Sequence, residues 1–276
     1  MPPDRLRLPH YVRFVLLAPL CALAMIGTPI HALAQGFAAY ITPPRFEVQV
    51  APGQTLRQVV EIQHVGQQKG NYRIYTNDWT FRPDNSVDFS EALSSDSCRP
   101  WVAVERRELT IDPGSRYRYR FEISPPAGTP ARECRFALMV EGLEAARVEG
   151  SLNFPVGGRI AVIVYARIGD AAPQLEIAKT GVAQVDGKPV AVVDVHNRGN
   201  AHGRLEGFVN GVDAGGARFE MAPADLPILP GETRRIAITP VADEGKPASV
   251  VRFPLAVKGN LEWGKNRLPL DTSFSP

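Results

Sequence analysis

The sequence of 276 residues predicts an all-β chain with two β-sandwich domains behind a cleaved N-terminal signal. Three observations support this fold class. Many short runs alternate between apolar and polar residues with a period of two, as strands with one buried face do. Most of the 25 prolines and 24 glycines stand between such runs, where turns need them. The N-terminus carries an apolar segment with the flanks of an export signal.

Residues 1–34 have the parts of a secretory signal peptide. Arg5, Arg7 and Arg13 form a basic start, an apolar run follows, and Ala32-Leu33-Ala34 is a small-x-small cleavage motif. A membrane-spanning helix needs about 20 apolar residues, so this run is short for the alternative, a membrane anchor. Cys21 follows a leucine, which argues against a lipid-attachment site. We therefore expect export to the periplasm and no membrane span in the mature chain.

The charges of the mature chain balance. Once residues 1–34 are removed, 28 basic and 28 acidic residues are left, so the net charge of +2 belongs to the signal. A neutral chain has no overall electrostatic attraction for nucleic acid or for an anionic membrane. We expect neither as a partner.

The first block of strands, in the predicted domain 35–168, is separated by turns rich in proline and glycine. Strands are expected at 45–50, 56–62, 72–81, 117–123 and 136–140. No sustained helical period occurs, although 90–97 is a candidate for one short helical turn. A hinge is expected at 168–173, where Gly169 and Pro173 interrupt the pattern.

The second block, the predicted domain 169–276, has the same character. Strands are expected at 175–177, 181–185, 190–196, 204–209, 233–239, 250–257 and 268–274, and Asp186-Gly187 marks a hairpin. About seven short strands in each block are typical of an immunoglobulin-like β-sandwich. A Pro-Gly turn precedes strands in both blocks, which fits either related domains or the frequent use of that turn.

Two cysteines follow the signal, Cys98 and Cys134. Export places them in an oxidising compartment, where such a pair forms a disulfide. Zinc binding is the weaker alternative, because two thiols without nearby histidines cannot complete a four-ligand site. We therefore expect a Cys98–Cys134 disulfide and no metal.

Motifs for catalysis are missing from the sequence. It contains no G-x-S-x-G, H-E-x-x-H, P-loop or dinucleotide fingerprint, and no cofactor is expected. The histidines of the mature chain, His64, His196 and His202, lack partners at metal-ligand spacing, and we interpret them as surface or turn residues. The sequence therefore argues against an enzyme and favours binding through backbone and apolar surface.

One segment has the pattern expected of a strand offered to another chain. In 147–168, Leu152, Phe154 and Val156 alternate with polar residues or proline, and a nearly continuous apolar run follows Gly157-Gly158. Pro155 cannot donate a ladder hydrogen bond, which favours an edge position. An exposed edge strand is a template for pairing with a foreign chain.

Here the sequence resembles the periplasmic pilus-assembly chaperones of the chaperone–usher pathway, over roughly residues 38–168. Three segments carry the resemblance. They are Tyr40-Ile41-Thr42-Pro43-Pro44-Arg45-Phe46, the Pro113-Gly114 turn before an alternating strand, and Leu-x-Phe-x-Val from 152 followed by Arg159-Ile160 and an apolar strand. The resemblance implies a chaperone that caps pilin-like subunits by strand donation and delivers them to an outer-membrane usher.

The resemblance also implies roles for individual residues. Leu152, Phe154 and Val156 would be the donated side chains, and Arg45 would anchor a subunit's terminal carboxylate in the cleft between the domains. The family usually has a lysine where Ala161 stands, so Arg159 or Arg167 would have to substitute if no bulge intervenes.

Three alternatives stay open. The 152–156 side chains pack within this protein, Arg45 forms an ordinary surface ion pair, or the chain is a secreted adhesive or scaffolding module without a pilin client. The second domain and the cysteine pair depart from the family pattern.

Overall fold

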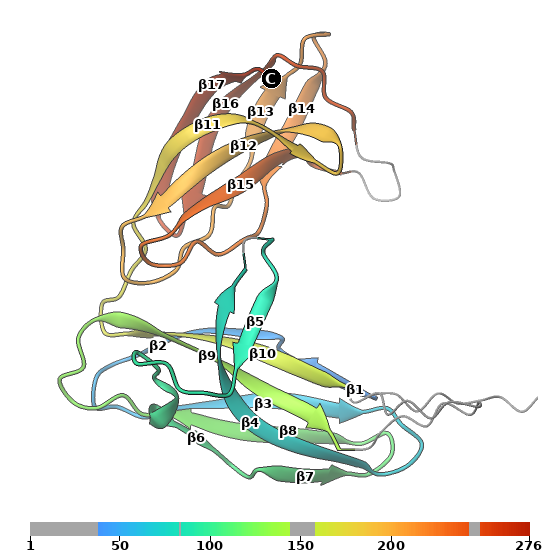
Figure 1. Cartoon of the computed structure of the whole chain (residues 1–276), viewed down its shortest axis with the longest axis vertical. Coiled ribbons are helices and arrows are strands. Elements are labelled where there is room, and N and C mark those ends of the chain that lie inside the picture. Colours follow the sequence, from blue (N-terminus) through green and yellow to red (C-terminus); the bar gives the residue numbers. More distant parts are fainter. Residues whose placement is uncertain (1–37, 83, 144–157, 243–248) are drawn as a thin grey trace, which may run out of the picture. The chain divides into compact units, whose positions relative to one another are not determined.

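The computed structural model describes residues 38–82, 84–143, 158–242 and 249–276 (Figure 1). Their contacts belong to one compact unit, Ala34–Pro276. The regular elements in these ranges are seventeen strands and one short 3-10 helix, so the all-β prediction is confirmed. No helix within the described ranges is long and apolar enough to cross a membrane. The predicted signal and the 152–156 segment lie outside the described residues.

The first ten strands form the first domain. Their bounds are β1 Ala39–Thr42, β2 Arg45–Val50, β3 Leu56–His64, β4 Gly70–Phe81, β5 Val87–Ser90, β6 Val102–Val104, β7 Glu108–Ile111, β8 Arg116–Ile123, β9 Arg132–Gly142 and β10 Arg159–Ile168.

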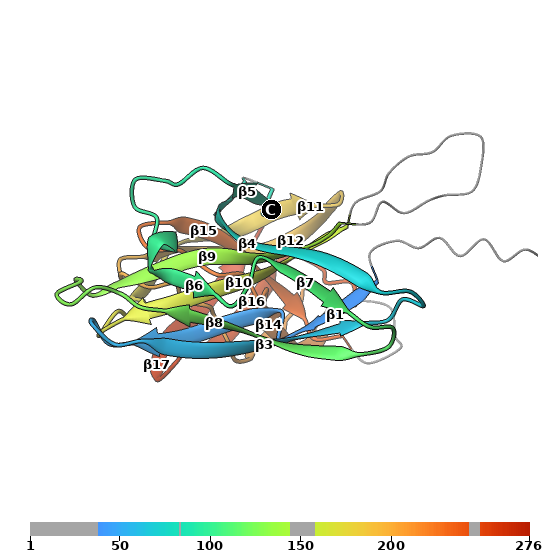
Figure 2. The same cartoon turned by 90° about the horizontal axis from the view of Figure 1, so that it is seen from below.

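Two sheets make up this domain, and they face each other (Figure 2). One has the order β1-β3-β8-β6, and the other has β2-β10-β9-β4-β5 with β7 also paired to β4. The core between them contains Phe121 and Phe136, whose rings meet edge to face. β8 shows why the pattern folds this way, because Tyr119 and Phe121 are buried while Arg118 and Arg120 between and beside them are exposed.

The remaining strands form the second domain. Their bounds are β11 Leu175–Val185, β12 Lys188–Asn197, β13 Val209–Val212, β14 Arg218–Pro223, β15 Thr233–Pro240, β16 Leu255–Trp263 and β17 Asn266–Phe274. They follow one hydrogen-bonded path, β11-β12-β15-β14-β13-β16-β17. The path folds over a core of its own, to which Val193, Ile236 and Phe274 belong.

Several predicted turns occur as expected. The glycines of three Pro-Gly turns, Gly53, Gly114 and Gly231, have φ of 77°, 67° and 74° and precede β3, β8 and β15. This left-handed conformation is readily available only to glycine. At Asp186-Gly187 both φ angles are positive, 50° and 74°, and the turn joins β11 to β12 as a hairpin.

Four local predictions were wrong. The separate strands expected at 175–177 and 181–185 form the single strand β11, with a register shift between Ile177 and Lys179. The helical turn expected at 90–97 lies instead at Arg99–Trp101, as a 3-10 helix with proline in its first turn. The strand expected at 204–209 starts only at Val209 and is preceded by single bridges at Gly203 and Glu206. The strand expected from 250 starts at Leu255. In segments 204–208 and 250–254, apolar and polar residues alternate as in a strand, but no continuous strand in the described ranges lies beside them to pair with.

Candidate functional site

The start of β10 is paired on one side only. β9 runs antiparallel to β10 over its whole length, from Arg159 opposite Glu141 onward. On the other side β2 runs parallel to it, but only from Ile163, which lies opposite Arg45. In the described part of the chain, no strand pairs with residues 159–162 on the side away from β9.

The direction of the peptide groups shows which backbone amides and carbonyls of β10 point away from β9, where no described strand pairs with residues 159–162. The amide of Ile163 donates to the Pro44 carbonyl at 3.3 Å, away from β9. Peptide groups two residues apart along a strand point to the same side. The amides and carbonyls of Arg159 and Ala161 therefore point toward the unpaired side. In the sequence, the residues of this open edge follow the segment with Leu152, Phe154 and Val156, which lies outside the described residues.

The outward face of this sheet carries an apolar cluster of its own. The register of β10 against β9 contains no bulge, so Arg159, Ala161 and Arg167 share one face with Ile163 and Tyr165. We call the cluster on this face the outer cluster; its buried members are Trp79, Ala137, Met139 and Tyr165, with Tyr75, Phe81, Val87, Phe89, Ala161, Ile163 and Leu229 around them. The run 159–168 is thus apolar on both faces, as its sequence suggests.

Arg45 and Arg159 lie on this outward face but apart from each other. Arg45 is at the register of Ile163, four positions from Arg159, which corresponds to about 13 Å along the strand. The Arg45 guanidinium contacts Glu47 at 2.9 Å and Asp225 at 3.9 Å. The surface ion pair considered for Arg45 is therefore present. To reach one carboxylate group, the two side chains would have to extend toward each other across this distance.

Arg159 has different surroundings. Its cross-strand neighbour Glu141 is occupied by Arg73, whose Nε and Nη2 donate to it at 3.0 and 2.7 Å. Arg159 is exposed, and among the described residues no carboxylate lies within ion-pair distance of it. Of the two predicted anchors, Arg159 has the more available guanidinium.

Beside Arg45 the sheet carries a buried polar cluster centred on His202. The His202 Nδ1 lies 2.5 Å from Oε2 of Glu133 on β9, and its Nε2 lies 3.6 Å from Oε1 of Glu47 on β2. Its ring stacks on Tyr165 of β10, with centroids 3.9 Å apart. Arg204 bridges Glu47, at 3.5 Å, and Asp225, at 2.7 Å.

These contacts shift the titration of the cluster. Interaction with His202 is the main cause that lowers the pKa of Glu47 to about 2; burial opposes it, and Arg45 and Arg204 add to it. Burial alone would lower the pKa of His202, but the hydrogen bonds and negative charges of Glu133 and Glu47 outweigh it and raise this pKa above 6.5. Burial also raises the pKa of Tyr165 to about 12.

The interpretation of the histidines as surface or turn residues was wrong for two of them. His64 is 5% exposed and its Nδ1 lies 2.6 Å from the Tyr72 hydroxyl, while His202 is 7% exposed. The carboxylates around His202 come from strands distant in sequence, so spacing along the chain did not show them. The partners of His64 are close in sequence, the Tyr72 hydroxyl and the Gln68 carbonyl, but neither is a metal ligand type that the spacing argument considers. His196 is partly exposed, and its Nδ1 lies 2.9 Å from the Thr233 hydroxyl.

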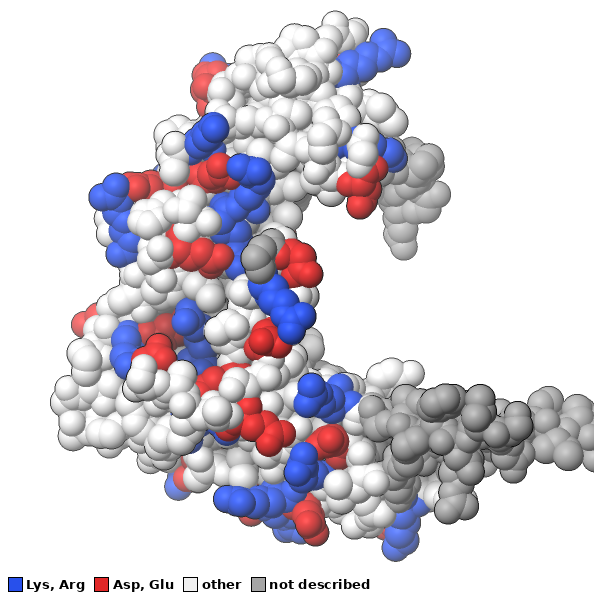
Figure 3. Space-filling view, in the orientation of Figure 1, with Lys and Arg blue, Asp and Glu red and all other residues white. Residues whose placement is uncertain are grey.

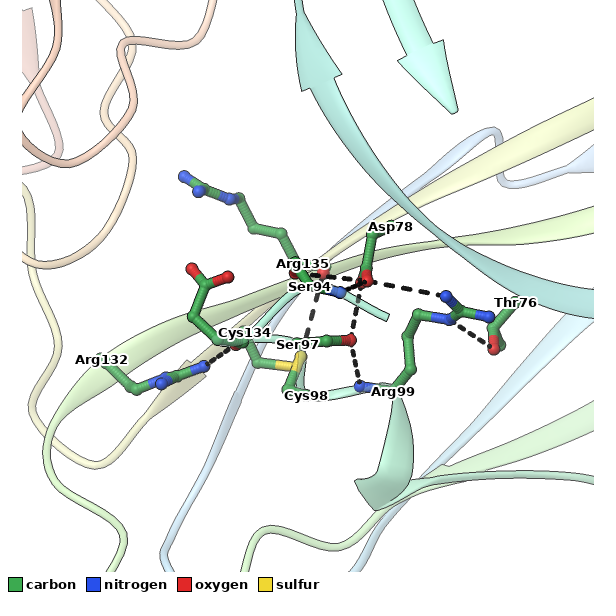
Figure 4. Close-up of a disulfide and its surroundings, with 10 residues drawn as sticks. Thr76, Asp78, Ser94, Ser97, Cys98, Arg99, Arg132, Cys134 and Arg135 are labelled. Carbon is green, nitrogen blue, oxygen red and sulfur yellow. Dashed lines mark hydrogen bonds and ion pairs between the residues drawn. A yellow bond between two sulfur atoms is a disulfide. The ribbon is translucent and has the colours of Figure 1, made fainter. Parts of the chain in front are cut away.

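The predicted disulfide joins Cys98 to Cys134 and is confirmed (Figure 4). It ties the segment before β6 to β9. Asp78 organises the same segment, accepting from the Ser94 amide at 2.9 Å and the Ser97 hydroxyl at 2.7 Å. Arg99, beside the disulfide, donates to the Thr76 hydroxyl and lies 3.6 Å from Asp78. Within the described ranges, no group of three or more metal-ligating side chains occurs.

Positive and negative side chains alternate over the face shown in Figure 3, without a field of one sign. This agrees with the balanced charge of the chain after residue 34. This face therefore presents no strongly charged docking area of one sign.

No protein-family model matches the sequence, and no curated protein does. Solved structures similar in fold include the class 5 fimbriae chaperone CfaA, at 13% identity over 86% of this chain and 99% of that chain, with a TM-score of 0.47. A chain of the CsuC–CsuE chaperone–tip subunit complex from Acinetobacter baumannii matches at 13% identity, over 87% and 100%, with a TM-score of 0.44. A chain of the Salmonella enterica SafA pilin–SafB chaperone complex matches at 10% identity, over 86% and 97%, with a TM-score of 0.46.

Proposed function

We propose that this chain is a periplasmic assembly chaperone that caps secreted pilin-like subunits by donating a strand. The observation that carries the proposal is the open edge at the start of β10, next to the alternating Leu152, Phe154 and Val156. A strand that is paired on one side can accept a second neighbour on the other, and its alternate side chains can fill a groove in that neighbour.

Backbone pairing gives affinity, whereas the side chains give the register. If residues 152–156 extend β10, the edge of this strand that faces away from β9 would be open from Leu152 to Ala161. A subunit that lacks a final strand has the complementary defect, since its core is open and one of its strands has an unpaired edge. Joining the two satisfies both edges and covers the apolar side chains of both partners.

Arg45 and Arg159 are the proposed anchors for the terminal carboxylate of the subunit. Because their positions lie about 13 Å apart along the strands, they are alternative anchors, each able to bind the carboxylate as a fork by itself. Arg159 is available without rearrangement, whereas a carboxylate at Arg45 has to displace Glu47 or Asp225. Ala161, which replaces the lysine of the resembling family, lies between them on the same face.

The remaining parts of the proposal follow from export and from the fold. The chain would act in the periplasm after loss of residues 1–34, with domains 35–168 and 169–276, and would pass its subunit to an outer-membrane usher. It would need no cofactor and catalyse no reaction, because strand exchange forms and breaks only noncovalent contacts.

Co-expression with a pilin-like subunit that lacks its last strand tests the proposal. We expect a 1:1 complex by size exclusion and native mass spectrometry. Phe154→Glu should abolish the complex, because a charge cannot enter the apolar groove, while Asn153→Glu, on the alternate face, should preserve it. A complex that survives Phe154→Glu would contradict strand donation and favour a scaffolding module.

A further inference from the structure

The segment 200–204, which precedes β13, docks on the six-stranded sheet through His202. The amide of Glu133 donates to the Asn200 carbonyl at 2.9 Å, and the Asn200 side chain donates to the Ala131 carbonyl at 2.7 Å. The amide of His202 donates to Oε2 of Glu133, also at 2.9 Å. These bonds join the second domain to the start of β9.

The imidazole of His202 lies between two carboxylates. Only its doubly protonated form has an N–H for each of them. Carboxylates of Glu133 and Glu47 accept hydrogen bonds and cannot donate while ionised. A neutral imidazole has one N–H, so it can donate to one of them and must turn a lone pair toward the other. The imidazolium donates at Nδ1 and presents a positive N–H at Nε2, which matches both neighbours.

Because the side chains of His202 and Glu133 are buried, the protonation state of His202 affects the stability of this contact between the domains. The Glu133 side chain has 0% exposure and the His202 side chain 6%, so their charges are little screened by water. A buried carboxylate without a charged partner is costly. The other cation near Glu133 is Arg135, at 3.7 Å from Oε1. Without a charge on His202, Glu133 still accepts from the His202 amide, but among the described residues its one positively charged neighbour is then Arg135, at that longer distance.

Other charged groups around His202 are already engaged with each other. Arg204 and Arg45 lie nearest to Glu47, and both also contact Asp225, so their positive charges are largely compensated. Tyr165 stays neutral, because burial raises its pKa to about 12. The protonation that changes near neutral pH is therefore that of His202.

We propose that His202 is a protonation-sensitive clasp that fastens the 200–204 segment of the second domain to β9 and β2. Acidification fastens the clasp and mild alkalinisation loosens it. A second contact between the domains, the Arg234 guanidinium over the Phe81 ring at 4.1 Å, does not involve His202, so the domains stay in contact when the clasp loosens. This inference does not depend on the proposed function.

The pH dependence of the clasp follows from the linkage between protonation and folding stability. The pKa of His202 is raised in the folded protein, so its stabilisation is fully present below about pH 6.5 and is lost as the pH rises through the folded pKa. The pKa of Glu47 is lowered to about 2, so its stabilisation is present above about pH 4.5 and is lost on acidification toward pH 2. The clasp is therefore complete between about pH 4.5 and 6.5.

Amide hydrogen exchange of the purified protein at pH 5.5 and pH 8.5 tests the clasp. We expect the protection factors of the His202 and Glu133 amides, which cross the joint, to fall by about tenfold for each unit by which folding raises the His202 pKa. The Asn197 and Gly231 amides, bonded within the second domain, are the internal reference and should keep their protection. Equal protection of the joint amides at both pH values would overturn the proposal.

Two variants separate His202 from other titrating groups. His202→Gln should give joint amides with low protection at both pH values. His196→Gln removes a partly exposed histidine bonded to Thr233 and should behave as the wild type. If His202→Gln retains the wild-type pH response, another group controls the joint and the proposal fails. The wild-type measurement decides the question alone should His202→Gln fold poorly.

Discussion

Ile163 of β10 lies opposite Arg45 of β2, and this pair marks the point where β10 gains its second neighbour. Upstream of Ile163 the strand is paired with β9 alone within the described ranges. Arg45 is thus both the first residue of β2 and the boundary of the open edge.

The disulfide should contribute substantially to stability. Cys98 and Cys134 are 36 residues apart, and closing such a loop in the unfolded chain contributes about 4 kcal/mol in the chain-entropy account. We expect Cys98→Ser to lower the free energy of unfolding in urea by that amount. Reduced wild-type protein should match the variant, and a stability unaffected by reduction would show that the segment before β6 is held by other contacts.

Asp78 should be the main noncovalent tie of the same segment. Its carboxylate accepts from the Ser94 amide and the Ser97 hydroxyl and is largely buried. Asp78→Ala should destabilise by about 2–3 kcal/mol, because the Ser94 amide, the Ser97 hydroxyl and Arg99 lose their common carboxylate partner. Asp88→Ala, which removes an exposed ion pair with Arg82, should cost under about 1 kcal/mol. Equal costs in thermal or urea unfolding would contradict this reading.

Gly199 should be required by close packing. A Cβ at Gly199 would lie 2.3 Å from the Ala172 carbonyl oxygen and 2.6 Å from the Gln174 amide nitrogen, both of them backbone atoms. Gly199→Ala should therefore cost about 1–3 kcal/mol, since the chain on either side must shift. Gly181→Ala is the matched control, because nothing lies within 4 Å of its Cβ and its stability should be unchanged or slightly raised. A neutral Gly199→Ala would show that the 172–174 segment adapts freely.

Local pattern predicted much of the fold, because alternation and turn chemistry act over a few residues. β8, with Tyr119 and Phe121 inward, and the Asp186-Gly187 hairpin are examples. The pairing of β2 with β10 joins residues more than a hundred positions apart, and no local signal specifies it. Short strands such as β6 and β7 were missed for the same reason, since their place depends on β8 and β4.

The site was predictable only in part. The disulfide followed from export and cysteine count, and the shared face of Arg159, Ala161 and Arg167 followed from regular alternation. The His202 cluster did not, because Glu47, Glu133 and Tyr165 come from three strands that only the folded sheet brings together. The residues that flank His202 in the sequence form a turn and do not indicate that its side chain is buried.

Amide exchange over residues 152–161 is the measurement that tests strand donation most directly. In the isolated protein, the Arg159 and Ala161 amides should exchange rapidly, since among the described residues no strand pairs with them on the side away from β9. Strand donation predicts the same rapid exchange for the amides of the 152–156 segment that would continue this edge. On adding a pilin-like subunit that lacks its final strand, the same amides should become protected while those of Ile160 and Val162, already directed at β9, change little. Slow exchange of Arg159 and Ala161 in the isolated protein would contradict the account, because the edge would then be satisfied from within.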